Sequence, residues 1–93
     1  MFKDITKELQ ELHDKKNADY SGGDNNYKNF RQNSMVWGTP AYTEPLKRLQ
    51  EKVIRIAQLQ GREANNESIE DSIKDIATLA IIALTIYRTD NGN

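Results

Sequence analysis

The chain of 93 residues contains no cysteine and has no excess of either charge. Without cysteine it can form neither a disulfide framework nor a thiolate metal site. Its 13 basic and 14 acidic residues give a net charge of -1, which lacks the positive excess typical of non-specific nucleic-acid binding. We therefore expect no direct nucleic-acid partner, and any affinity for phosphate has to be local.

Several targeting and nucleotide-binding motifs are also missing. The first 16 residues, MFKDITKELQELHDKK, mix both charges and lack the apolar segment and cleavage site of a signal peptide. The most apolar stretch, ATLAIIALTIY, is too short to cross a bilayer. No P-loop, dinucleotide fingerprint or EF-hand loop is present. These absences predict a cytoplasmic protein without a membrane partner.

The length of the chain limits the size of its core. A domain of this size buries only a little over ~60% of the surface of its unfolded chain, so an isolated monomer has a thin core. The stretch ATLAIIALTIY, residues 77–87, is apolar nearly all round, as expected of a central or intersubunit helix. We therefore expect a homo-oligomer, either a dimer or a dimer of dimers.

Apolar spacing predicts an all-α fold of three main helices in one domain. Phe2, Ile5, Leu9 and Leu12 follow one another at helical intervals and form one stripe. Thr43 is the predicted N-cap of the next helix. The helices are expected at about residues 2–17, 44–60 and 67–88.

The segment of residues 18–43 shows no helical period, and glycine and proline interrupt it, which leaves room for at most one short turn of helix. A loop of this length inside a small domain is usually functional or disordered. Its aromatic residues argue against plain disorder: Tyr20, Tyr27, Phe30 and Trp37. They predict a functional loop, with the alternative that Tyr27 and Phe30 only plug the end of the bundle.

Carboxylates follow one face of the last predicted helix. In ESIEDSIKD, Glu67, Asp71 and Asp75 stand four residues apart, about opposite an apolar face made of Ile69, Ile73, Ile76 and Ala80. Like charges stacked in this way are mildly destabilising, and a divalent cation such as Mg²⁺ would explain them. The alternative is an acidic first turn followed by one solvated aspartate that pairs with Lys52 or Arg55 of the neighbouring helix.

The helix before it is mainly basic around one acid, Glu51. Two antiparallel helices joined by a short turn can bring Glu51 opposite Asp71 or Asp75, beside the cations of the same helix. That arrangement suits a metal-bound polyphosphate. A surface ladder of Lys47, Glu51 and Arg55 is an equally good explanation of the spacing.

Four segments together carry a family resemblance: KNADY at 16–20, NF at 29–30, LKRLQEKVIRI at 46–56 and ESIEDSIKDIATLA at 67–80. In this order the chain resembles the phage and bacterial nucleotide modification associated domains, which are relatives of the MazG-like all-α nucleoside triphosphate pyrophosphohydrolases. The resemblance implies a helical bundle completed by a second subunit, and host cytoplasm as the location if a phage encodes the protein.

The resemblance also implies a magnesium site. Its ligands would be Glu51, Glu67, Asp71 and Asp75, with Glu51 and Asp71 as the catalytic residues. The chain departs from the MazG pattern at Arg48, where the pattern has a second acid.

A nucleotide is expected between the loop and the basic helix, with an aromatic ring against the base. The expected binding residues are Lys16, Asp19, Tyr20, Tyr27, Asn29, Trp37, Arg48, Lys52 and Arg55.

Three functions follow from these patterns. The first is Mg²⁺-dependent hydrolysis of a (deoxy)nucleoside triphosphate to monophosphate and pyrophosphate. The second is binding without turnover, as in a phage anti-defence protein that sequesters a nucleotide signal, and the third is a structural or adaptor bundle.

Overall fold

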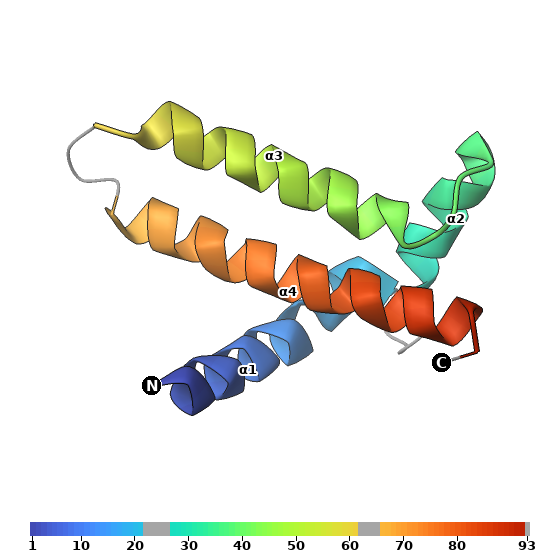
Figure 1. Cartoon of the computed structure of the whole chain (residues 1–93), viewed down its shortest axis with the longest axis horizontal. Coiled ribbons are helices and arrows are strands. Elements are labelled where there is room, and N and C mark those ends of the chain that lie inside the picture. The colour runs from blue at the N-terminus through green and yellow to red at the C-terminus, as the bar shows by residue number, and fades with distance from the viewer. Residues whose placement is uncertain (22–26, 62–65, 93) are drawn as a thin grey trace.

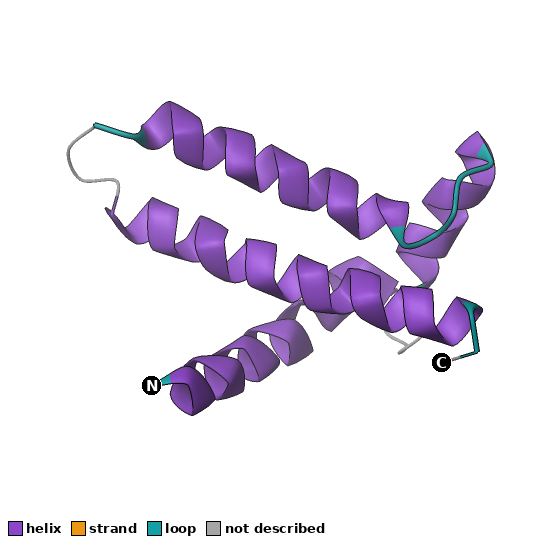
Figure 2. Ribbon diagram, in the orientation of Figure 1, coloured by secondary structure: helices purple, strands orange, loops and turns teal. Residues whose placement is uncertain are grey.

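The computed structural model describes residues 1–21, 27–61 and 66–92, and in this part of the chain every regular element is a helix (Figures 1 and 2). The side chains of residues 18–21, 66 and 67 lie outside the description. The all-α prediction is confirmed. The helices are α1 (Phe2–Ser21), α2 (Lys28–Trp37), α3 (Thr43–Leu59) and α4 (Asn66–Asp90).

An antiparallel hairpin of α3 and α4 forms the centre of the molecule (Figure 1). Helix α1 crosses α4 obliquely on the side away from α3, and α2 packs across the end of the hairpin where α3 begins and α4 ends. None of the described helices combines the length and the apolar content that a bilayer span requires.

The apolar core lies where α2 meets this end of the hairpin. Its buried side chains come from the start of α2 and from the second half of α4, and they are Tyr27, Phe30, Leu79, Ile82 and Ile86. The rings of Tyr27 and Phe30 pack 6.5 Å apart. Both aromatic residues therefore plug the end of the bundle, the alternative that the sequence left open.

Helix α2 corrects the prediction of a long loop between residues 18 and 43. Instead of at most one turn, ten residues are helical, and they bury Phe30 and Ser34, which are four positions apart. Tyr27 stands just before the helix with φ 53° and ψ 49°, and Gly38 ends it with φ 66°. A helix this short is marginal alone, so its stability comes from packing against the hairpin.

Helix boundaries differ from the sequence expectation in two further places. Helix α1 continues to Ser21, beyond its predicted end at residue 17. Thr43 does not cap α3: Tyr42 holds the N-cap position, and the Thr43 hydroxyl donates to the carbonyl of Pro40 at 2.7 Å. That hydroxyl therefore stabilises the turn before the helix rather than its first N–H groups.

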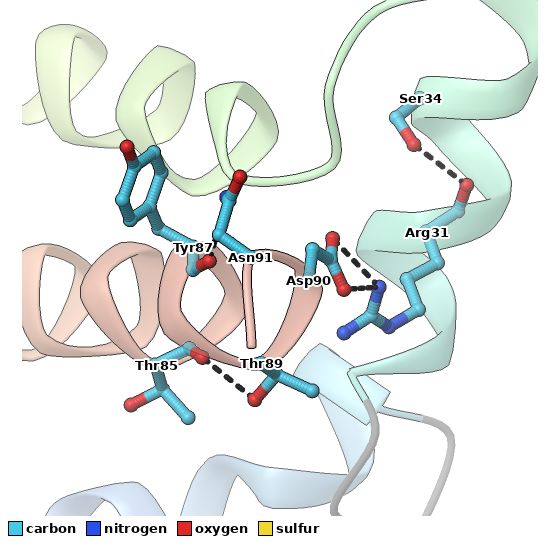
Figure 3. Close-up of polar contacts among 7 residues, drawn as sticks. All are labelled: Arg31, Ser34, Thr85, Tyr87, Thr89, Asp90 and Asn91. Carbon is cyan, nitrogen blue, oxygen red and sulfur yellow. Dashed lines mark hydrogen bonds and ion pairs between the residues drawn. The ribbon is translucent and has the colours of Figure 1, made fainter. Parts of the chain in front are cut away.

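Polar and aromatic contacts fix α2 and the start of α3 to the end of α4. Arg31 Nη1 lies 2.8 and 3.1 Å from the two carboxylate oxygens of Asp90 (Figure 3). Tyr42 and Tyr87 meet edge to face, with ring centroids 5.3 Å apart. The ion pair is charge-assisted, and together with the ring contact it holds the end of α4 against α2 and the start of α3.

The first half of α4 does not divide into the two faces that the sequence predicts. Ile73 and Ala80 were expected to share one apolar face with Ile69 and Ile76; Ile69 and Ile76 are half-buried, but Ile73 is 54% exposed and Ala80 is exposed as well. The structure instead buries Asp75. The physical reason is that the interface with α3 follows the stripe that also contains Leu79 and the apolar residues after it.

Replacing Ile86 with alanine tests the core. Ile86 is fully buried, so the variant should lower the free energy of unfolding by about 2–5 kcal/mol. Val36→Ala on α2, where the side chain is 75% exposed, should change it by less than about 0.5 kcal/mol. Urea unfolding at one fixed protein concentration measures both. Equal losses in the two variants would contradict this placement of the core.

Candidate functional site: a lysine–aspartate junction of three helices

The Asp75 carboxylate joins three helices at one point. It lies in the middle of α4, and its side chain is 12% exposed. Lys16 of α1 donates to its Oδ1 at 3.0 Å, and Nζ of Lys52 on α3 lies 3.3 Å from its Oδ2. Both carboxylate oxygens are therefore engaged by ammonium groups from different helices.

The position of Asp75 on the helix explains why it is buried. Asp75, Leu79, Ile82 and Ile86 follow at intervals of four, three and four and form one stripe that faces α3 and α2. Burial of a carboxylate is unfavourable unless the charge is paired. Lysine meets that need here because its long apolar stem packs along the helices while its ammonium group reaches the carboxylate.

Among the described residues, the junction brings two lysine cations to one carboxylate. The side chains of Lys16 and Lys52 are 38% and 36% exposed. Arg48 and Arg55 stand four residues before and three after Lys52, so all three share one face of α3. We call Arg48, Lys52 and Arg55 the basic face of α3. Cations gathered in this way attract phosphate groups.

The acids predicted as magnesium ligands are not brought together. Lys52, rather than its neighbour Glu51, lies against Asp75, and Glu51 is exposed. The side chain of Asp71 is 64% exposed, and Nζ of Lys74 is 4.0 Å from it. Among the described residues, no three acidic or histidine side chains are placed to share a metal ion. The described donors therefore do not fit Mg²⁺, and the side chain of Glu67 lies outside the described residues.

Other predicted nucleotide contacts are spread over the molecule. Tyr27 is buried in the core, and Trp37 is 75% exposed at the far end of α2. Asn29 is half-buried in the first turn of α2. The side chains of Asp19 and Tyr20 lie outside the described residues. Tyr27 was among the aromatic residues expected near a base, but its side chain is buried away from solvent.

A polar pair in the groove between α1 and α4 was not predicted. Tyr27 Oη lies 2.8 Å from His13 Nε2, and the two rings meet edge to face. Burial raises the pKa of Tyr27. The groove has a volume of about 290 Å³, and Leu9 and Ile81 are among the apolar residues that line it. His13 of α1 therefore contacts Tyr27, the residue just before α2, and helps to hold the two together.

Sequence reasoning missed that Asp75 faces inward, although a signal was present. The predicted apolar face through Ile73 and Ala80 is no more regular in spacing than the stripe formed by Asp75, Leu79, Ile82 and Ile86. The regular spacing of the acids at residues 67, 71 and 75 instead predicted that Asp75 belongs to an acidic, metal-binding face. No spacing rule identifies Lys16 as a partner, because it lies 59 positions away.

Comparisons of the chain with family models, with curated proteins and with solved structures find no match. The family resemblance therefore depends on the four segments that carry it.

Removing the charge at the junction should destabilise the fold. Asp75→Asn leaves two ammonium groups beside a neutral amide, so we expect a loss of about 1–3 kcal/mol in the free energy of unfolding. Asp71→Asn, on the same helix but exposed, should change it by less than about 0.5 kcal/mol. Urea unfolding near pH 7 compares the two variants. If Asp75→Asn is no less stable than Asp71→Asn, the junction contributes nothing to the fold.

Tyr27 should make the protein sensitive to alkali. Its pKa in the folded protein is raised above the ordinary 10.0, so the folded state favours the protonated phenol. That contribution is fully present below pH 10 and is lost as the pH rises through the raised pKa. Tyr27→Phe should therefore lose less stability between pH 9 and pH 11 than the wild type does, by urea unfolding. Val36→Ala, at an exposed position that does not titrate, serves as the control and should keep the wild-type dependence.

Proposed function

We propose that the protein binds a nucleotide through its phosphate groups at the junction of Lys16, Lys52 and Asp75. The observation that supports this most strongly is that two half-exposed lysine ammonium groups contact one buried carboxylate at a point where α1, α3 and α4 meet. Asp75 holds the two ammonium groups in place, and each remains more than a third exposed. An anion from solvent can therefore reach them without breaking the fold.

The length of the basic face favours a polyphosphate over a single phosphate ion. Arg48, Lys52 and Arg55 extend over two turns of α3, which is about 10 Å along the helix axis. Several phosphate groups in a row can contact several of these cations at once. Arg48 also lies 5.5 Å from the centre of the Phe30 ring, a cation–π contact that orients its guanidinium group. The nucleoside part of the ligand is inferred from the family resemblance.

Binding without turnover agrees with the geometry better than hydrolysis does. The resemblance implies Mg²⁺-dependent pyrophosphate release, for which carboxylates from two adjacent helices hold the metal. Here both oxygens of Asp75 are engaged by lysines, and Lys52 stands where an acid of α3 would be needed. The protein would then hold a nucleotide, as a sequestering protein does. A protein with this function would act where free nucleotides occur, which is the cytoplasm, or the host cytoplasm if a phage encodes it.

A nucleotide panel tests the proposal. Purified protein is incubated with (deoxy)nucleoside triphosphates, once with Mg²⁺ and once with EDTA, and free and protein-bound small molecules are identified by mass spectrometry. We expect intact nucleotide to be recovered only after heat denaturation of the protein. Monophosphate and pyrophosphate in solution would establish hydrolysis instead. If no nucleotide is retained or changed, the chain is a structural bundle and the proposal is wrong.

Single lysine variants locate the binding site. Lys52→Met should weaken binding of the retained nucleotide by about ten-fold, because one charge-assisted hydrogen bond to phosphate is lost. Lys16→Met should have a similar effect. Lys7→Met, an exposed position on the same helix as Lys16, is the matched control and should bind as the wild type does. Calorimetric titration gives the affinities, and circular dichroism checks the fold. Equal affinity in all three variants would place the nucleotide elsewhere.

A further inference from the structure

The groove of about 290 Å³ between α1 and α4 contains polar side chains that the lysine–aspartate junction does not use. We call it the α1–α4 groove. Its buried residues, Tyr27, Thr78 and Ile82, form the floor, and the exposed side chains of Gln10 and Thr85 stand at its rim. Its volume is close to the lower end of the range for small-molecule sites, about 300–1,000 Å³, so the groove fits one compact ring system.

Two threonines of α4 line this groove as hydrogen-bond acceptors. The Thr78 hydroxyl donates to the carbonyl of Lys74 at 3.0 Å, and the Thr85 hydroxyl donates to the carbonyl of Ile81 at 2.9 Å. A hydroxyl group has one proton and two lone pairs. Because each proton is already used within the helix, the oxygen of each threonine accepts a hydrogen bond from a ligand more readily than it donates one.

Gln10 of α1 adds a third acceptor. Its Nε2 group donates to Oδ1 of Asp14 at 3.0 Å. A carboxylate only accepts, so this contact fixes which end of the amide is the NH₂ group and leaves the amide oxygen as an acceptor. The other described residues of the groove have aliphatic or aromatic side chains. A ligand that fits this lining has a flat apolar ring and donates hydrogen bonds.

The α1–α4 groove begins one helical turn from the junction on both helices. On α1, His13 of the groove is three residues before Lys16 of the junction, and on α4, Thr78 is three residues after Asp75. Three residues rise about 5 Å along a helix axis. A nucleotide is longer than one helical turn, so it is long enough to place its base in the groove and its phosphate groups at the lysines.

We infer that the α1–α4 groove binds the base of the nucleotide, and that it selects a base with an exocyclic amino group. Adenine and cytosine carry such a group, which donates two hydrogen bonds. Uracil and hypoxanthine have a carbonyl oxygen in its place, beside a single N–H donor. That oxygen would meet the lone pairs of the Thr78 and Thr85 hydroxyls. The inference rests on the nucleotide binding proposed above and adds the part of the ligand that the junction does not select.

Two pairs of nucleotides test the selection, because the members of each pair differ only at the exocyclic group and the ring nitrogen beside it. Cytidine triphosphate should bind about five- to ten-fold more tightly than uridine triphosphate, since one more neutral hydrogen bond is formed. Adenosine triphosphate should exceed inosine triphosphate in the same way. Calorimetric titration measures the affinities. Equal affinities within both pairs would overturn the selection.

Threonine-to-valine variants locate the base. Thr85→Val keeps the shape of the side chain but removes the acceptor, so cytidine triphosphate should bind about five- to ten-fold more weakly. Inorganic tripolyphosphate, which has no base, should bind as it does to the wild type. Thr89→Val is the matched control: its exposed hydroxyl also donates within α4, to the carbonyl of Thr85 at 2.8 Å, but Thr89 lies one turn beyond the described lining of the groove. Equal effects of the two variants on cytidine triphosphate would reject the groove.

His13, the one histidine of the chain, reports on the groove directly, because its ring lines it. At one fixed pH, cytidine triphosphate should shift the imidazole C–H signals in the NMR spectrum, and tripolyphosphate should shift them clearly less. If tripolyphosphate binds as tightly as the nucleotides and the His13 signals stay in place, the phosphate site stands and the groove is wrong. If neither ligand binds, the proposed function is wrong and this inference falls with it.

Discussion

The ion-paired carboxylate of Asp75 is the constraint on which the arrangement of the helices depends. A charge that is mostly buried requires compensation, and the two compensating ammonium groups come from α1 and α3. These contacts set where both helices lie against α4. The same contacts gather two lysine ammonium groups, each more than a third exposed, where the three helices meet.

The two halves of α4 are stabilised in different ways. Its second half buries Leu79, Ile82 and Ile86 against α2 and the start of α3, and that apolar cluster is the core of the chain. Its first half buries Ser72 and Asp75 instead. Apolar burial is therefore concentrated at one end of the hairpin. A chain of this size has little core to distribute, so the polar half needs its ion pairs to remain packed.

The proposed phosphate-binding surface consists of the junction and the basic face of α3. Arg48 adds positive charge to the face of α3 that already carries Lys52, which agrees with a site built from cations.

The sequence by itself determined that the chain is all-α, and it located three of the four helices to within a few residues. Helical periodicity is a local property, so it can be read without knowing what each helix packs against. Lys16, Lys52 and Asp75 were also among the predicted site residues, the two lysines as nucleotide contacts and Asp75 as a magnesium ligand.

Only the tertiary structure decided which stripe of α4 turns inward and which base pairs with Asp75. Two stripes of α4 are equally regular, one through Ile73 and Ala80 and one through Asp75 and Leu79, and the sequence offers no means to rank them. The choice follows from what α1, α2 and α3 place opposite each stripe. Helix α2 was missed for the same reason: ten residues with few apolar positions become helical because Phe30 packs into a core built by distant parts of the chain.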